Sequence, residues 1–393
     1  MKKVFLFSLF LVLGLVLSQC LPVWLGEAFL TAEKVAKTLM FVCLAFIMIN
    51  VGREFELDKT KWRSYAADYF IAMATAAVPW IMVAFYYMFL LPADLFGNWD
   101  AWKENLLLSR FAAPTSAGIL FTMLAAAGLR REWIYKKPQV LAIFDDLDTI
   151  LLMIPLQIFM IGFKWQLFAV VIVITFLLVI GWKKLGTIRL SQTWKSILFY
   201  AVCIVAVTES IYLLTKWMMG ADGAIHIEVL LPAFVLGMVM KTVHQHGNRD
   251  EKITGMISYL FMFLVGLSTP QFIGIDHGHR ITEAVGIIAA QPMPSWEVLV
   301  VHVIVVTLLS NLGKMFPLFF YRDRQLEERL ALSVGMFTRG EVGAGIIVIA
   351  MGYNLGGPAL IISVLSLVLN LLLTGGFVVI VKRLAQQAYG LKE

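Results

Sequence analysis

Two adjacent carboxylates stand within an apolar stretch, and they are the residues of this chain most suited to chemistry. Asp145 and Asp146 lie in the segment 141–155, most of whose other residues are apolar. Placing one charged side chain at the centre of a membrane helix costs roughly 2.5–3.5 kcal/mol. Carboxylates kept at that depth usually face a cavity and handle ions or protons. The pair therefore predicts an ion or proton site, provided that the segment crosses a membrane.

The spacing of the acids limits what they can do together. Neighbouring helical residues point about 100° apart, so Asp145 and Asp146 cannot share one direction. Asp148 follows Asp145 by three residues and lies near its face. A proton and a cation that compete for one carboxylate are enough to make an exchanger, if only the loaded forms change sides. For Asp148, a place in the ion site and a purely structural role remain equally open.

The composition requires a membrane protein. Hydrophobic residues make up 60% of 393 positions and charged residues only 15%, which excludes an ordinary soluble domain. A span needs about 20 apolar residues. We expect an all-α polytopic protein with about twelve spans, near 4–20, 36–52, 65–92, 106–128, 138–163, 165–182, 196–215, 225–241, 253–273, 296–320, 330–352 and 358–381.

The basic residues predict the orientation of these spans. With the N-terminus inside, the cytoplasmic segments hold 23 of the 32 Lys and Arg residues and the opposite side holds six, as the positive-inside rule requires. Both termini are therefore expected in the cytoplasm, with a bacterial inner membrane as the default. The net charge of +6 reflects this orientation and does not indicate nucleic acid as a partner. Three basic residues remain inside spans: Arg110, Lys314 and Arg339.

The ends and loops leave no room for another activity. The N-terminus resembles a signal or lipoprotein peptide, but Gln19 before Cys20 is too large for a typical lipobox, so we expect a retained first span. Cys20, Cys43 and Cys203 have no metal or redox spacing. The loops are short. We therefore expect one membrane transport domain over 1–393, with no soluble regulatory domain, no enzyme activity and no cofactor.

Two spans carry helix-breaking residues at mid-depth. The fourth contains Pro114 and Gly118, and the eleventh contains polar and glycine residues over 335–345. They occupy equivalent places in two three-span groups of opposite orientation, about 65–163 and 296–381. Paired broken spans in inverted repeats point to a secondary-transporter site at the midplane.

Other charged residues in the spans are weaker candidates. Lys314 either snorkels to the interface or pairs with Asp145. Arg339 and Glu341 are expected to neutralise charge at the broken eleventh span, in a structural or pH-regulating role. Arg110 is expected near the outer end of the fourth span, where it could snorkel. Glu209 lies deeper in the seventh span, and Asp68 is expected at the interface.

Together these residues resemble the monovalent cation:proton antiporter superfamily, specifically its NhaA/NapA-like, Asp-Asp branch. The resemblance covers almost the whole chain. Four motifs carry it: Pro114-Thr115-Ser116 with Gly118, Phe144-Asp145-Asp146, Leu312-Gly313-Lys314 and Thr338-Arg339-Gly340-Glu341-Val342-Gly343.

The resemblance implies an NhaA-like fold, a homodimer, and a six-helix core that moves like an elevator against a dimerisation domain. It implies that Asp146 is the main carboxylate for the transported sodium and proton, that Asp145 is its partner acid and pairs with Lys314, and that Thr115 lines the ion site, with Ser116 beside it. It also implies electrogenic sodium (or lithium)/proton exchange.

Alternatives remain open. One alternative is a potassium/proton antiporter, because Arg-Gly-Glu also occurs in potassium-efflux relatives. Those relatives often carry a cytosolic nucleotide-binding domain, which is not expected here, so sodium is favoured over potassium. A sodium-coupled organic-anion symporter has a related fold. A channel would pass current without proton coupling. An intramembrane aspartyl protease would place its aspartates on separate helices, unlike Asp145 and Asp146.

Overall fold

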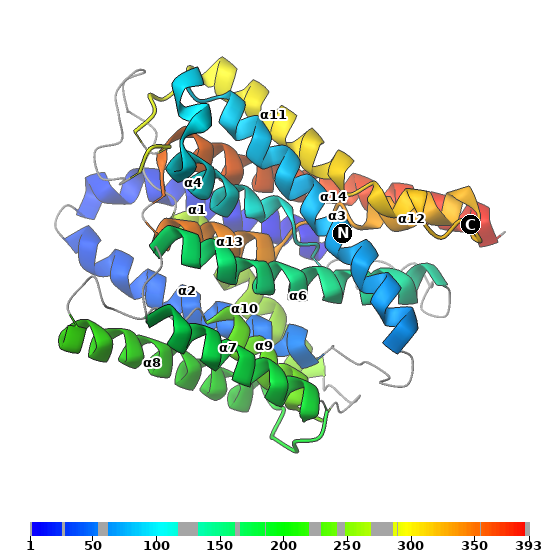
Figure 1. Cartoon of the computed structure of the whole chain (residues 1–393), viewed down its shortest axis with the longest axis horizontal. Helices are drawn as coiled ribbons and strands as arrows, with labels where there is room; N and C mark the ends of the chain where they lie inside the picture. Colours follow the sequence, from blue (N-terminus) through cyan, green and yellow to red (C-terminus); the bar gives the residue numbers. More distant parts are fainter. Residues whose placement is uncertain are drawn as a thin grey trace.

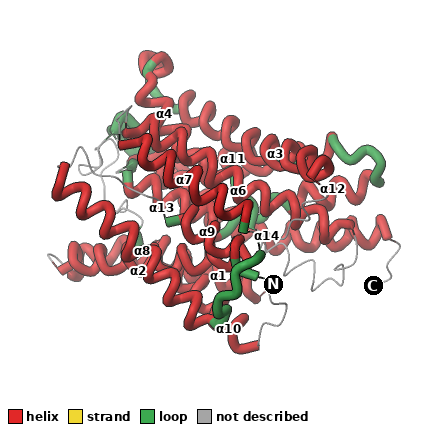
Figure 2. The backbone as a smooth tube through the Cα atoms, turned by 60° about the horizontal axis from the view of Figure 1, so that its bottom comes forward, coloured by secondary structure: helices red, strands yellow, loops and turns green. Residues whose placement is uncertain are grey.

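The structure is a computed structural model that describes residues 2–25, 28–53, 62–116, 133–161, 166–184, 186–219, 229–241, 248–268, 286–288, 290–353 and 355–389. The described residues form helices joined by loops and turns, without a strand (Figure 2). One isolated parallel bridge joins Ile188 to Met240.

The helices follow the order of the expected spans. The α-helices are α1 (Lys2–Leu25), α2 (Ala28–Arg53), α3 (Trp62–Phe89), α4 (Trp99–Ser109), α6 (Trp133–Ile161), α7 (Gln166–Lys183), α8 (Trp194–Met219), α9 (Leu230–Val239), α10 (Asn248–Leu267), α11 (Trp296–Gly313), α12 (Leu326–Gly335), α13 (Glu341–Gly352) and α14 (Gly357–Tyr389). The 3₁₀ turns are η2 (Ala93–Gly97), η3 (Arg110–Ala112) and η5 (Phe316–Phe319).

Each of the twelve expected spans overlaps at least one of these helices, although only residues 106–116 of the expected fourth span, 106–128, are described. Among the described residues, five helices are long and apolar enough to cross a membrane by length and composition. They are Lys34–Arg53, Ala66–Phe89, Trp194–Trp217, Trp296–Phe319 and Gly357–Tyr389. The chain is thus a polytopic helical membrane protein, as its composition predicted.

The helices form two groups (Figure 1). In one group α3 packs on α4, α6 and α11, while α14 packs on α11 and α12. In the other group α2 packs on α8, α9 and α10, and α7 packs on α9. Helix α1 joins the groups because it packs on both α10 and α14. Both broken segments belong to the first group, which therefore holds the candidate site.

Two very close helix crossings involve the second group: one joins α1 to α10, and the other joins α2 to α9. Gly14 on α1 meets Gly266 on α10, and Gly52 on α2 meets Gly237 on α9. In all four cases, a Cβ on the glycine would stand 2.1–2.2 Å from a carbonyl oxygen three residues before the partner glycine. Small residues allow this backbone approach, which is a common way to join membrane helices. The two crossings share one geometry although their glycines lie far apart in the sequence.

Polar clusters join segments that are expected on the same side of the membrane. Near the start of α3, Asp68 is only 5% exposed; its carboxylate accepts two 2.9 Å bonds from Lys137 Nζ on α6 and one from Tyr321 Oη. On α4, the Glu104 carboxylate accepts bonds of 3.0 and 2.9 Å from the backbone N–H groups of residues 287 and 288. The first cluster gathers segments expected inside, and the second gathers segments expected outside.

Candidate functional site

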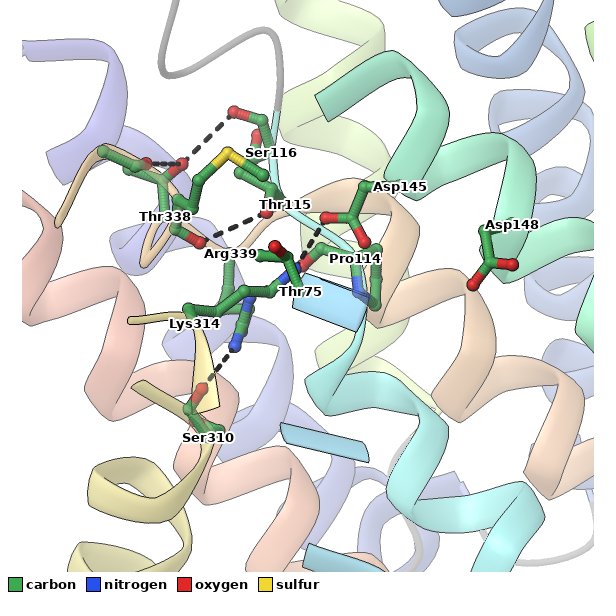
Figure 3. Close-up of polar contacts among 12 residues, drawn as sticks. Thr75, Pro114, Thr115, Ser116, Asp145, Asp148, Ser310, Lys314, Thr338 and Arg339 are labelled. Atoms are coloured by element: carbon green, nitrogen blue, oxygen red, sulfur yellow. Dashed lines mark hydrogen bonds and ion pairs between the residues drawn. The ribbon is translucent and has the colours of Figure 1, made fainter. Parts of the chain in front are cut away.

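Two broken helices cross at the centre of the first group (Figure 3). After η3 the chain leaves the helix over 113–116, and between α12 and α13 it is non-helical over 336–340. The Ser116 backbone N–H donates to the Thr338 carbonyl at 2.8 Å, and Thr338 Oγ1 donates to the Ser116 carbonyl at 3.3 Å. Thr115 Oγ1 donates to the Met336 carbonyl at 3.2 Å. The eleventh span is therefore interrupted as predicted, and the helix of the fourth span ends at the predicted place, the rest of that span lying outside the described residues. The two non-helical segments satisfy backbone groups of one another.

Local chemistry explains why the helices stop here. Pro114 has no backbone N–H, so it cannot continue the hydrogen-bond ladder of α4 and η3. On the other segment, Gly343 lets the first turn of α13 approach the first broken segment, since a Cβ there would lie 3.1 Å from the Phe111 carbonyl. Irregular backbone at membrane depth is tolerated where it is buried in protein or lines a water-filled cavity.

Arg339 links the crossing to α11 by hydrogen bonds. Its side chain is 1% exposed, and it donates from Nη1 to the Pro114 carbonyl at 2.9 Å and from Nη2 to the Ser310 carbonyl at 3.1 Å. The guanidinium therefore supplies hydrogen bonds to a carbonyl of the first broken segment and to one of α11. It also places positive charge where the carbonyl end of the first half-helix carries partial negative charge.

A buried ion pair lies beside the crossing. Lys314 Nζ is 2.6 Å from Asp145 Oδ2, and both side chains are fully buried. Lys314 directly follows the end of α11, where its backbone N–H donates to the Asn311 carbonyl at 3.1 Å. Asp145 Oδ1 has no hydrogen-bond partner among the described residues. Within the described part of the structure, the lysine therefore holds one of the two carboxylate oxygens.

A second buried pair corrects the expectation for Arg110. Its side chain is fully buried and donates from Nη2 to the Asp148 carbonyl at 3.0 Å and to Asp148 Oδ2 at 3.3 Å. Its guanidinium carbon also lies 4.3 Å from the centre of the Trp80 ring. The prediction that Arg110 snorkels at the outer end of its span was wrong. The helix begins at Trp99, before the expected span, so Arg110 lies roughly 16 Å along it.

The remaining candidates are not all gathered at the crossing. Asp146 belongs to α6 and Glu341 begins α13, but both side chains lie outside the described part of the structure. Glu209 is half-buried on α8, which packs on α2, α9 and α10 rather than on the broken helices. Among the described residues, no group of three or more His, Cys, Asp or Glu side chains could hold a resident metal ion.

Sequence reasoning missed a row of polar contacts between α11 and α14. Thr307 Oγ1 and Ser366 Oγ are 2.9 Å apart, and Asn370 Nδ2 donates to Asn311 Oδ1 at 2.9 Å. The signal was present in the sequence, because Ser363, Ser366 and Asn370 recur at three- and four-residue spacing along an otherwise apolar helix.

Interrupted helices that meet beside a buried acid–base pair, within a helical membrane bundle, are typical of secondary ion transporters. A family model described as sodium/hydrogen exchanger, transmembrane, matches residues 2–385. The chain therefore belongs to the sodium/hydrogen exchanger family and is a membrane transporter of monovalent cations. A comparison with curated proteins gave no match.

Proposed function

We propose that this family member is an electrogenic antiporter that exchanges sodium or lithium for protons, with Asp145, Asp146 and Lys314 as the exchanging groups. The observation that carries the proposal is the fully buried contact between Lys314 and Asp145 at the crossing of the broken helices. A buried ion pair is tolerated only while both partners are present, since an unpaired charge in the interior is costly. A cation that takes over the carboxylate therefore displaces the lysine proton.

The exchange is defined by the number of protons that one sodium ion displaces. Without a cation, the Lys314 ammonium neutralises Asp145 and a proton neutralises Asp146. A sodium ion that enters between the two carboxylates, with Thr115 as a further oxygen ligand, takes the place of both protons, so the sodium-loaded site carries one positive charge fewer than the proton-loaded site. One proton leaves Asp146 and one leaves Lys314, so two protons exchange for one sodium ion and each cycle moves one net charge. Asp148 takes no part because Arg110 already neutralises it.

The orientation and assembly belong to the same proposal. Both termini face the cytoplasm of a bacterial cell, the protein works as a homodimer in the inner membrane, and the two repeats 65–163 and 296–381 are inverted. The two glycine crossings support the inverted repeats. Exchanging the repeats relates the first span to the eighth and the ninth span to the second. It therefore relates the α1–α10 crossing to the α9–α2 crossing, and these two crossings share one close geometry.

The test is transport in liposomes. Internal pH is followed after addition of sodium, lithium or potassium to vesicles that contain the wild-type protein, Asp146→Asn or the matched control Asp148→Asn. The proposal expects proton movement with sodium or lithium that is lost in Asp146→Asn and kept in Asp148→Asn. Movement with potassium alone would assign the potassium/proton alternative. No cation-dependent proton movement between pH 6 and 9 would overturn the antiport mechanism, and sodium uptake coupled to an organic anion would replace it with symport.

A further inference from the structure

One buried threonine on α6 lacks the hydrogen bond that the other buried threonines make. Seven threonines are buried in the described part of the structure. In six of them the hydroxyl donates to a backbone carbonyl: Thr75, Thr115, Thr208, Thr307, Thr338 and Thr374. The seventh, Thr149, is fully buried, and its Oγ1 has no hydrogen-bond partner among the described residues. A helical threonine usually has the carbonyl four residues before it within reach, so this hydroxyl does not point at its own helix.

The geometry of α6 places Thr149 on the face that carries the acid of the buried ion pair. At about 100° per residue, its position around the helix lies roughly 40° from that of Asp145 and 60° from that of Asp146. Side chains on a helix lean toward its N-terminus, so Thr149 leans back over the turn that begins at Asp145. Asp148 lies about 100° away from Thr149 around the helix and pairs with Arg110. Figure 3 shows the Asp145 carboxylate directed toward the crossing, with Asp148 apart from it.

Two buried oxygens without a hydrogen-bond partner therefore lie on one face of α6. Asp145 Oδ1 is the second of them, because Lys314 Nζ bonds Oδ2, at 2.6 Å. Residues four apart on a helix have Cβ atoms about 5–6 Å apart, yet the Thr149 hydroxyl and the Asp145 carboxylate do not bond each other. Such buried atoms in native proteins usually indicate a bound ion or water, and one bound ion can reach both oxygens.

A sodium-sized cation matches the two oxygens in type and spacing. Calcium, which has nearly the radius of sodium, takes oxygen ligands at about 2.3–2.6 Å. Two oxygens on one such ion therefore lie up to about 5 Å apart, which side chains on successive helical turns can span. The neighbouring guanidinium groups are bonded elsewhere, Arg110 to Asp148 and Arg339 to backbone carbonyls. Neither of them bonds these two oxygens.

We propose that Thr149 is a further ligand of the transported cation, which is held between the Thr149 hydroxyl and Asp145 Oδ1; this rests on the antiport proposed above. The two oxygens of Asp145 then have different roles. The cation binds Oδ1 and the hydroxyl while Lys314 still bonds Oδ2. It therefore arrives before the lysine leaves, and Asp145 is never buried without a positive partner, a state that would be costly.

Sodium binding and transport together test this assignment. The variants are Thr149→Val, which keeps the shape of threonine without its hydroxyl, and Thr149→Ser, which keeps the hydroxyl. The matched control is Thr374→Val, because Thr374 is an equally buried threonine of the same helix group whose hydroxyl bonds its own helix. Binding is followed as the rise in the unfolding midpoint of detergent-purified protein when sodium chloride replaces choline chloride. Transport is followed as proton movement in liposomes over the same sodium range.

The hydroxyl should matter for sodium and not for folding. In Thr149→Val, the sodium concentrations for half-maximal stabilisation and half-maximal proton movement should each rise at least about tenfold, because a ligand of a charged group is lost. In Thr149→Ser and Thr374→Val, both should stay within about threefold of wild type. Without sodium, Thr149→Val should unfold at no lower temperature than wild type, since its hydroxyl has no hydrogen bond to lose.

Three results would decide against the ligand or against the transport function. Unchanged sodium dependence in Thr149→Val, or an equal rise in Thr374→Val, would show that the hydroxyl only fills space and would overturn the ligand. A lower unfolding midpoint of Thr149→Val without sodium would show a structural partner and would overturn it too. Wild-type protein that sodium stabilises through Thr149 but that moves no protons would support the ligand and overturn the antiport function instead.

Discussion

On α6, Asp145 and Asp148 lie three residues apart, and each holds a buried base from another helix. Asp145 pairs with Lys314 at 2.6 Å, with one oxygen left free. Asp148 pairs with Arg110, which is also bonded to the Asp148 backbone carbonyl and lies over Trp80. The extra contacts fix Arg110 in place, whereas a lysine has a flexible stem. The proposed function assigns exchange to the Lys314–Asp145 pair and a structural role to the Arg110–Asp148 pair.

Removal of Lys314 should destabilise the protein through the acid left behind. Lys314→Met leaves Asp145 buried without its base, and the loss of one partner of a buried pair costs about 3–5 kcal/mol. Adding Asp145→Asn should recover most of that loss, because the uncompensated charge is then gone. Thermal unfolding of purified protein in detergent, followed by tryptophan fluorescence, measures both. A double variant no more stable than Lys314→Met would contradict the pairing.

Asp148→Asn should separate stability from transport. It leaves the Arg110 guanidinium buried with less compensation, so the free energy of unfolding should fall by about 3–5 kcal/mol. Sodium-driven proton movement should stay within twofold of wild type, because Asp148 faces Arg110 and not the crossing. Transport assays in liposomes at a temperature well below unfolding measure this. A loss of transport with stability intact would place Asp148 in the ion site.

At the scale of elements, the glycine crossings show where backbone contact holds helices together. Gly266 and Gly255 both lie on α10, but a Cβ on Gly266 meets the Leu11 carbonyl at 2.2 Å, whereas one on Gly255 meets nothing within 4 Å. Gly266→Ala must push α1 away and should cost at least about 1–3 kcal/mol. Gly255→Ala should be neutral or stabilise the helix by up to about 1 kcal/mol. Unfolding midpoints of the two variants give the comparison, and equal midpoints would refute the close crossing.

The elements also show how far sequence alone could lead. Pro114 and the glycines near Arg339 predicted both breaks because several such residues stand together with polar ones at mid-span; a single proline, such as Pro79 in α3 or Pro155 in α6, leaves its helix unbroken. The start of α4 was missed because Trp99 to Glu104 include three charged residues, which indicate a loop, although Glu104 is buried against residues 287 and 288. That error of several residues placed Arg110 too near the surface.

Partners between helices were harder to foresee than breaks within them. From the residues, pairing with Asp145 was one of two alternatives for Lys314, and the resemblance to known antiporters favoured it, because spacing along the chain does not say which helices touch. The serines and asparagine of α14 form a polar stripe that is visible in the sequence, but the stripe does not indicate that it packs against α11. Tertiary packing supplies that information.

At the scale of the whole molecule, the clusters at the two ends bring together segments that the charges placed on the same side of the membrane. Asp68, Lys137 and Tyr321 join segments expected inside. Arg53, which ends α2, donates to Gln192, whose side chain donates to the Lys241 carbonyl, and these three segments are also expected inside. Glu104 joins two segments expected outside. No contact described here requires a segment to change sides.

Electrogenic exchange predicts that voltage alone moves sodium through this molecule. Two protons entering for each sodium ion that leaves carry one net charge, worth about 2.3 kcal/mol per 100 mV. With equal pH on both sides and 100 mV negative inside, sodium should be expelled until its concentration is about fifty-fold higher outside than inside. Liposomes with a potassium diffusion potential and a sodium-sensitive dye measure this gradient, and vesicles clamped at zero voltage are the control. A gradient that does not respond to voltage would mean one proton for each sodium ion, with Lys314 keeping its proton throughout the cycle.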